Sequence, residues 1–124
     1  MRQAIEDRGD HAELVSIEGE HLSAVTFVQD YVQLHFDGPR LTLVTWPVVV
    51  ADDVSHPFGE SGYRDELCKL IGRVVARAYV RTGDRLQIDF TDRASLVASL
   101  KAEAYRAAHV VIFDDGQSKQ WAAW

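Results

Sequence analysis

Residues 31–46 read YVQLHFDGPRLTLVTW, with the turn-forming residues Asp37-Gly38-Pro39 between two runs rich in apolar residues. On each side of Asp37-Gly38-Pro39 the sequence alternates between apolar and other residues, which is the two-residue period of a half-buried β-strand. Asp, Gly and Pro favour a turn, because Gly accepts positive φ and Pro fixes its own φ. The stretch therefore predicts a β-hairpin whose first strand turns Val32, Leu34 and Phe36 towards a core.

The sequence around this hairpin occurs a second time. Residues 13–19 (ELVSIEG) resemble residues 66–72 (ELCKLIG), which lie 53 positions later. The strand patterns that follow also return, with one extra residue inserted at each step: 32–36 matches 86–90, and 41–43 matches 96–98. Self-similarity that keeps its order along the chain indicates an internal duplication.

Each copy predicts a short helix closed by a glycine and then three strands in a meander. Gly19 and Gly72 suit the position after a helix, because glycine adopts the left-handed conformation without a Cβ clash. We therefore expect an α+β fold that is mainly β. In it, two repeated helix-plus-three-strand meander units, at about 11–46 and 64–100, pack as a sandwich or a partly open barrel.

The rest of the chain completes a single predicted domain, residues 1–124. Residues 47–62 are predicted to be a linker, since Pro, Gly and acidic residues are frequent there. Residues 109–124 are predicted to form a C-terminal hairpin, because Asp115-Gly116 separates two apolar runs. Units that cannot bury an apolar face alone need each other, so one cooperative domain is expected.

Composition limits the class of protein. The 124 residues carry a formal net charge of −6 and are 47% hydrophobic and 26% charged, as in ordinary globular domains. Negative charge opposes binding to nucleic acid phosphates, and no apolar run approaches the ~20 residues that span a bilayer. Cys68 is the single cysteine, so neither an internal disulfide nor a cysteine metal cluster is expected. The first residues lack the apolar core of a signal peptide, which predicts a cytoplasmic location.

Four polar residues are candidates for a binding or catalytic site: His35, Asp37, His56 and Tyr63. His35 and Asp37 lie two positions apart on one predicted strand, so they face the same side, as a metal-binding pair or a His–carboxylate pair would. Any half-buried strand also presents a polar outer face of this kind. The five histidines lack zinc-motif spacing, and no nucleophile elbow, P-loop or dinucleotide fingerprint occurs. We therefore expect no catalytic residue, no cofactor and no metal ligand.

A second candidate site is apolar, and it is an interface or ligand patch of Trp46, Val44, Val48, Trp121 and Trp124. The predicted strand at 41–46 is apolar on both sides. The chain ends on aromatic residues, whereas termini are usually polar, and Trp is frequent at the centre of protein interfaces. Three interpretations stay open: the edge of the domain's own core, a homodimer contact, or a ligand groove.

Three stretches resemble small uncharacterised bacterial proteins of a domain-of-unknown-function family: 27–39 (FVQDYVQLHFDGP), 70–75 (LIGRVV) and 121–124 (WAAW). The shared motifs are turns, strand alternation and a helix end. The resemblance therefore implies one intact domain and carries no activity with it. Similar small β-rich proteins occur among the immunity proteins of bacterial toxin systems, which is an analogy of fold alone.

These features together favour a non-catalytic interaction or structural module of the bacterial cytoplasm that self-associates as a homodimer. Two alternatives stay open. Small size and acidic charge fit an immunity-type protein that neutralises a toxin. A cleft between the two repeats could instead serve a small-molecule binder or an enzyme.

Overall fold

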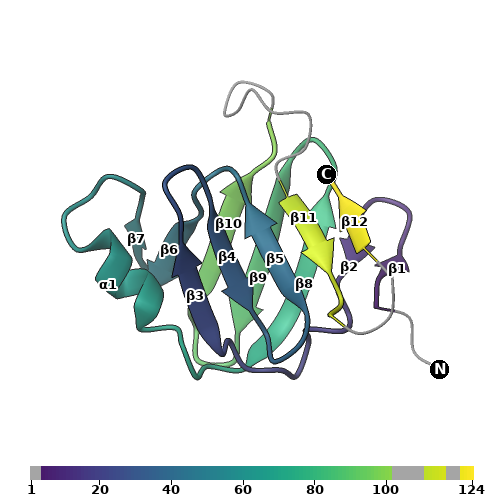
Figure 1. Cartoon of the computed structure of the whole chain (residues 1–124), viewed down its shortest axis with the longest axis horizontal. Helices are drawn as coiled ribbons and strands as arrows, with labels where there is room; N and C mark the ends of the chain where they lie inside the picture. Colours follow the sequence, from purple (N-terminus) through teal and green to yellow (C-terminus); the bar gives the residue numbers. More distant parts are fainter. Residues whose placement is uncertain (1–3, 102–110, 117–120) are drawn as a thin grey trace.

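The computed structural model describes residues 4–101, 111–116 and 121–124, which form two β-sheets and one short helix (Figure 1). The seven-stranded sheet contains, in spatial order, β1 (Glu6–Asp7), β2 (Ala12–Glu13), β8 (Val75–Arg81), β9 (Arg85–Phe90), β10 (Ser95–Ser99), β6 (Val48–Ala51) and β7 (Val54–His56). The five-stranded sheet contains β12 (Trp121–Ala123), β11 (Val111–Asp114), β5 (Arg40–Leu43), β4 (Val32–His35) and β3 (Ala24–Phe27). The helix α1 (Tyr63–Cys68) lies at the end of the molecule occupied by β6 and β7.

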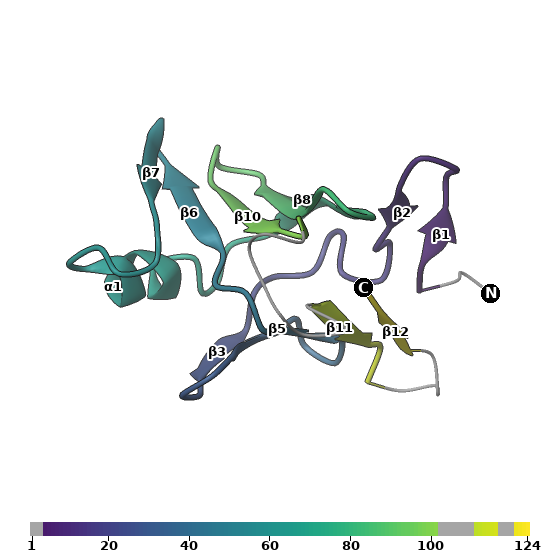
Figure 2. The same ribbon diagram turned by 90° about the horizontal axis from the view of Figure 1, so that it is seen from above.

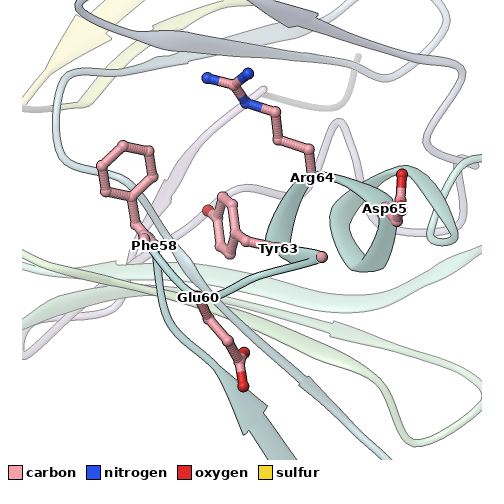
Figure 3. A pocket seen from close by; sticks show the side chains of 7 residues that line it. Phe58, Glu60, Tyr63, Arg64 and Asp65 are labelled. Carbon is pink, nitrogen blue, oxygen red and sulfur yellow. The ribbon is translucent and has the colours of Figure 1, made fainter.

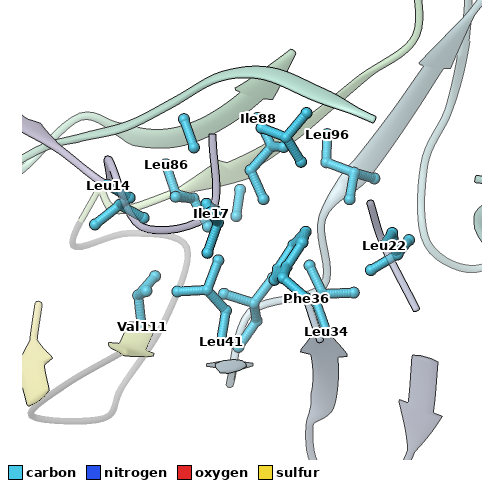
Figure 4. Close-up of a cluster of buried hydrophobic side chains, with 14 of the residues drawn as sticks. Leu14, Ile17, Leu22, Leu34, Phe36, Leu41, Leu86, Ile88, Leu96 and Val111 are labelled. Carbon is cyan, nitrogen blue, oxygen red and sulfur yellow. The ribbon is translucent and has the colours of Figure 1, made fainter. Parts of the chain in front are cut away.

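The two sheets face each other as the layers of a sandwich (Figure 2). Every second residue of β4 and of β9 is buried between them, as the alternating sequence predicts. Leu34 and Leu41 of one sheet meet Leu86 and Ile88 of the other in a single apolar cluster (Figure 4). Each of these side chains is at most 1% exposed, and burial of this kind stabilises the fold by roughly 1.5–3 kcal/mol per side chain.

The prediction of a mainly β fold is confirmed. Of the two predicted arrangements, a sandwich or a partly open barrel, the structure has two separate sheets that pack on each other. Three strands that follow one another in sequence are antiparallel neighbours in each sheet. They are β3, β4 and β5 in the five-stranded sheet, and β8, β9 and β10 in the seven-stranded sheet. The C-terminal strands β11 and β12 pair with each other, and β11 also pairs with β5. Residues 109–110 and 117–120 of the predicted hairpin lie outside the described residues.

The helix predicted at the start of the first unit is wrong. Residues 15–19 form consecutive turns, in which the N–H of Ile17 donates to the carbonyl of Leu14 and that of Glu18 to Val15. Leu14, Val15 and Ile17 are all buried. The buried side chains of this segment therefore point in several directions, whereas those of an amphipathic helix lie along one face. The helix of the second unit is present at Tyr63–Cys68 and is shorter than its apolar pattern predicts.

The segment 47–62, predicted to be a linker, is partly built into a sheet. It contains β6 and β7, which extend the seven-stranded sheet through the pairing of β6 with β10. Asp52 and Asp53 both have positive φ, 52° and 64°, and they form the two-residue turn between these strands. The chain therefore passes from the five-stranded sheet to the seven-stranded sheet between β5 and β6, and Val48-Val49-Val50 lies in the second of these sheets.

The two halves of the chain meet in a reciprocal set of backbone hydrogen bonds. The N–H of Gly19 donates to the carbonyl of Val75 (2.8 Å), and the N–H of Gly72 donates to that of Leu22 (2.7 Å). In a second pair of bonds, the N–H of Leu22 donates to the carbonyl of Arg73 (3.0 Å), and the N–H of Val75 donates to that of Glu20 (2.8 Å). Adding 53 to each residue of the first half gives its counterpart in the second. The antiparallel bridge between His21 and Val74 lies at the centre of this exchange.

Candidate functional site

Trp46 stacks with two aromatic rings of the chain itself. The ring of Phe27, from β3, lies 6.3 Å from it at an interplanar angle of 13°, and the ring of Phe58 lies 4.6 Å away at 18°. We call Phe27, Trp46 and Phe58 the aromatic stack. It connects the edge of the five-stranded sheet to the segment between β7 and α1, and the guanidinium of Arg64 lies 5.6 Å from the centre of the Phe27 ring.

Tyr63 has a structural role at the start of α1. Its hydroxyl donates a hydrogen bond to the carbonyl of Pro47, which ties the helix to the start of β6. The side chain is buried, and burial raises the pKa of Tyr63 above its usual value of 10.0. The Tyr63 ring also contacts the edge of Phe58 at 5.7 Å. A phenol that is buried, bonded and hard to ionise serves packing here.

A cavity of about 370 Å³ opens beside Phe58 and the first turn of α1 (Figure 3). Its lining includes Glu60, Tyr63, Arg64 and Asp65. In Figure 3 the charged ends of Arg64 and Glu60 point in different directions. Binding of a small ligand requires polar groups that converge on one point, and this lining does not offer them.

His35 and Asp37 have separate partners in the structure. The His35 ring Nε2 shares a hydrogen bond of 3.0 Å with the Thr26 hydroxyl, on the neighbouring strand. Asp37 follows β4 in an exposed turn with φ of 56°, and its N–H donates to the Ser23 hydroxyl at 3.1 Å. The alternation that would place His35 and Asp37 on one face ends with β4, because the turn begins there.

His56 lines a second cavity, of about 410 Å³, between β7, α1 and the turn after β9. Its Nδ1 lies 3.1 Å from a carboxylate oxygen of Glu60. Both cations of this cavity are also held by carboxylates: Lys69 by Glu66 at 2.8 Å, and Arg73 by Asp92 at 2.8 Å. Lys69 and Arg73 of this cavity are thus already paired with Glu66 and Asp92.

The predicted apolar patch is divided between different parts of the molecule. Trp46 belongs to the aromatic stack with Phe27 of edge strand β3, whereas Trp124 packs against the core beside β12, at the opposite edge of the same sheet. Val48 is half-buried in β6 of the other sheet, and Val44 is 36% exposed after β5. The backbone of Trp121 pairs with Asp114 in β12; its side chain lies outside the described part of the structure.

The sequence reasoning missed a row of uncharged residues on the outer face of the five-stranded sheet. The pairing register places five of them side by side, one from each strand: Thr26, Gln33, Thr42, Ile112 and Ala123. We call this set the neutral row. The Gln33 amide donates to the Thr42 hydroxyl at 3.2 Å, and Ile112 is 39% exposed. Strand register could reveal this row, whereas the pattern along any single strand does not.

The seven-stranded sheet has a different outer face, on which ionised side chains engage one another. Arg77 lies 3.1 Å from a carboxylate oxygen of the buried Glu13, and His11 lies 3.0 Å from the other oxygen. Burial by itself would raise the pKa of Glu13, but hydrogen bonding with Glu18, Arg77 and His11 outweighs burial and lowers this pKa from 4.5 to about 2. We call Glu13, Arg77 and His11 the charged cluster.

Comparison of the chain with protein-family models, with curated proteins and with solved structures finds no match. Among the described residues, no group of three or more His, Cys, Asp or Glu side chains is arranged to hold a metal ion. The same part of the chain contains no helix that is long and apolar enough to cross a membrane.

Proposed function

We propose that this protein is a non-catalytic interaction module of the bacterial cytoplasm that self-associates through its five-stranded sheet. The observation that carries the proposal is the neutral row, which crosses all five strands without a charged side chain and ends at Thr26 on the edge strand β3. Charged residues are depleted at the centre of protein interfaces, because each buried charge must lose its hydration. Two copies of a chain with a net charge of −6 repel each other overall, so a surface without charge favours their contact.

Two alternatives have less support. A small-molecule ligand in the His56 cavity would have to displace the ion pairs of Lys69 and Arg73, which already satisfy the charges there. An immunity-type function rests on size and net charge only, and no side-chain arrangement adds to it. Self-association is favoured over both because it accounts for an exposed surface that the chain does not use itself.

The mass of the protein in solution, measured by sedimentation velocity from low micromolar to millimolar concentration, tests the proposal. We expect a dimer that dissociates on dilution. Thr26→Lys places a charge in the neutral row and should shift the dissociation constant upwards at least tenfold, or about 1.4 kcal/mol. Val54→Lys, at a valine that is 51% exposed on the other sheet, is the matched control and should leave the dimer intact. A monomer at every concentration contradicts the proposal.

We also infer that the module arose by duplication of a unit now represented by about 11–46 and 64–100. The reciprocal hydrogen bonds between segments 19–22 and 72–75 support this inference, because a twofold axis relating two equal units produces such exchanged pairs. Equivalent apolar positions support it too, since Leu14 and Leu67 are both completely buried. The two units then act as an internal dimer that forms one domain.

A further inference from the structure

The edge of the five-stranded sheet at β3 carries unused backbone groups. Within the described residues β3 pairs with β4 alone. The N–H of Val28 donates to the carbonyl of Tyr31 at 2.9 Å, at the base of the hairpin. Hydrogen-bonded and non-bonded pairs alternate in an antiparallel ladder. The N–H and C=O groups of Val25 and Phe27 therefore point away from β4, at the edge of the sheet.

This edge differs from the other sheet edges of the described chain. Free edges are ordinarily protected against pairing by charges, by proline or by shortness. The edge strand β1 consists of two acids, Glu6 and Asp7. The edge strand β7 has three residues and follows directly on Asp52 and Asp53. The edge strand β12 also has three residues. In contrast, β3 reads Ala-Val-Thr-Phe and is followed by Val28, so it has neither charge nor proline.

We propose that β3 of a second copy of this chain pairs antiparallel with this edge, with Thr26 on the twofold axis. The proposal rests on the self-association proposed above and names its contact. With Thr26 opposite Thr26 of the second copy, the free groups of Val25 face those of Phe27 in the other copy, and the reverse. The two five-stranded sheets then continue as one sheet of ten strands.

A second copy fits this edge better than an unrelated strand, because the sequence of β3 is complementary to itself in this register. The pairs across the interface are Thr26 with Thr26, Val25 with Phe27, and Ala24 with Val28. Thr–Thr pairs and aromatic pairs with β-branched residues are favourable across strands, and no like charges meet. The exposed Val28, at 36%, gains an apolar neighbour. The neutral row also continues without interruption from one copy into the other.

Cysteine cross-linking tests this register directly. In a Cys68→Ser background, which removes the natural free thiol, Thr26→Cys places two thiols on the axis. Residues opposite each other in a non-hydrogen-bonded pair have Cα atoms about 4.5 Å apart, within the range of a disulfide. We expect mild oxidation to give a disulfide-linked dimer, which reducing agent converts back to monomer. Ala24→Cys in the same background is the control, since its two copies would lie roughly 13 Å apart at about 3.3 Å per residue.

A second set of variants separates pairing at the edge from contact through the sheet face. Ile112→Lys changes the neutral row three strands away from the edge, so it should leave the sedimentation behaviour of the dimer unchanged, whereas Thr26→Lys should weaken it at least tenfold. Both positions are exposed, and circular dichroism checks that the variants fold.

Each outcome has a distinct meaning. A wild-type dimer in which Thr26→Cys fails to cross-link, or cross-links no better than Ala24→Cys, overturns edge pairing and leaves the proposed self-association standing. Loss of the dimer in Ile112→Lys would also overturn edge pairing, because it would place the contact on the sheet face. A wild-type protein that stays monomeric removes the proposed function together with this inference. If the edge instead receives an extended peptide from another protein, the wild-type chain likewise stays monomeric.

Discussion

On the outer face of the seven-stranded sheet Arg77 is held by Glu13, Arg85 by Asp84 at 2.6 Å, and the Asp89 carboxylate accepts from Ser95. On the outer face of the five-stranded sheet the neutral row runs from Thr26 to Ala123 without a charge. On the first surface these charged side chains already have partners within the sheet. The second surface has a single ion pair beside this row among the described residues, between Arg40 and Asp114 at 3.4 Å, and its row reaches the edge strand β3 without a charge. Two sheets that share one core can thus have different outer faces, one with ion-paired side chains and one with an uncharged row.

Their buried faces, by contrast, are closely alike, and the largest expected effect tests this likeness. Phe36 and Phe90 occupy matching places, each at the end of a strand, and they are 0% and 4% exposed. Phe36→Ala and Phe90→Ala should each lower the free energy of unfolding by about 3–5 kcal/mol, because each removes a large side chain and leaves a cavity. Chemical denaturation gives both values. A loss confined to one variant would show that the two sheets do not share the core equally.

The charged cluster is the next largest contribution and depends on pH. Because Glu13 has a folded-state pKa of about 2 against an ordinary value of 4.5, its ionised form favours the folded state. This contribution is complete above pH 4.5 and is lost as the pH falls from 4.5 towards 2. Glu13→Gln should remove about 1–3 kcal/mol at neutral pH and flatten the fall in stability over that acid range. Thermal melts across this range measure it.

Glu6→Gln provides the control for this prediction. Glu6 is an acid of the neighbouring strand β1, and its side chain is 40% exposed beside Arg8. Its removal should leave both the stability and its acid dependence nearly unchanged, since exposed ion pairs contribute little. If stability falls equally steeply below pH 4.5 in the wild type and in Glu13→Gln, the charged cluster does not stabilise the seven-stranded sheet.

A pair of tyrosines compares a buried hydroxyl with one that has alternative partners. Tyr63→Phe leaves the buried carbonyl of Pro47 without its donor and should cost about 1–2 kcal/mol. Tyr79→Phe removes a hydroxyl that donates to Gln87 and accepts from Arg85. Arg85 also donates to Gln87 directly, so this second change should cost under about 1 kcal/mol. Equal losses in denaturation experiments would contradict the assignment of Tyr63 as the anchor of α1.

The smallest expected effect concerns the duplication. Gly19 and Gly72 have φ of 87° and 95°, and a Cβ at either would meet no atom within 4 Å. Alanine at either position therefore costs only the left-handed backbone strain, roughly 1–2 kcal/mol at most. Equal values for Gly19→Ala and Gly72→Ala are expected from equivalent positions of a duplicated unit. A clear difference between them would argue that the two turns are related by sequence resemblance alone.

Much of the strand content could be predicted from the sequence, because β4, β5, β9 and β10 have one buried and one half-buried face. This difference in burial between the two faces produces a two-residue alternation that is visible within each strand's own sequence. The turn at Asp37-Gly38 is predictable for the same reason, since its geometry demands particular residues. The first helix was mispredicted because residues 14–17 are buried on several sides, and in such surroundings periodicity does not distinguish a helix from a series of turns.

The candidate site was less predictable, because it depends on contacts between distant segments. Trp46 is explained by Phe27 and Phe58, which lie 19 positions before it and 12 after it. The chain passes from one sheet to the other at Pro47, just before β6, and no local sequence pattern indicates this change of sheet. The neutral row requires the register of five strands to be known together. His35 was singled out as a neighbour of Asp37, whereas its partner in the fold is Thr26.

The central claim, that the edge at β3 receives a second copy, is tested most directly by amide hydrogen exchange measured residue by residue in dilute and in concentrated solution. The N–H groups of Val25 and Phe27 gain acceptors only in the dimer. Their protection should therefore rise with protein concentration, while the amides of another edge strand, Val54–His56 in β7, exchange at unchanged rates. Exchange of Val25 and Phe27 that is equally fast at both concentrations would contradict the claim.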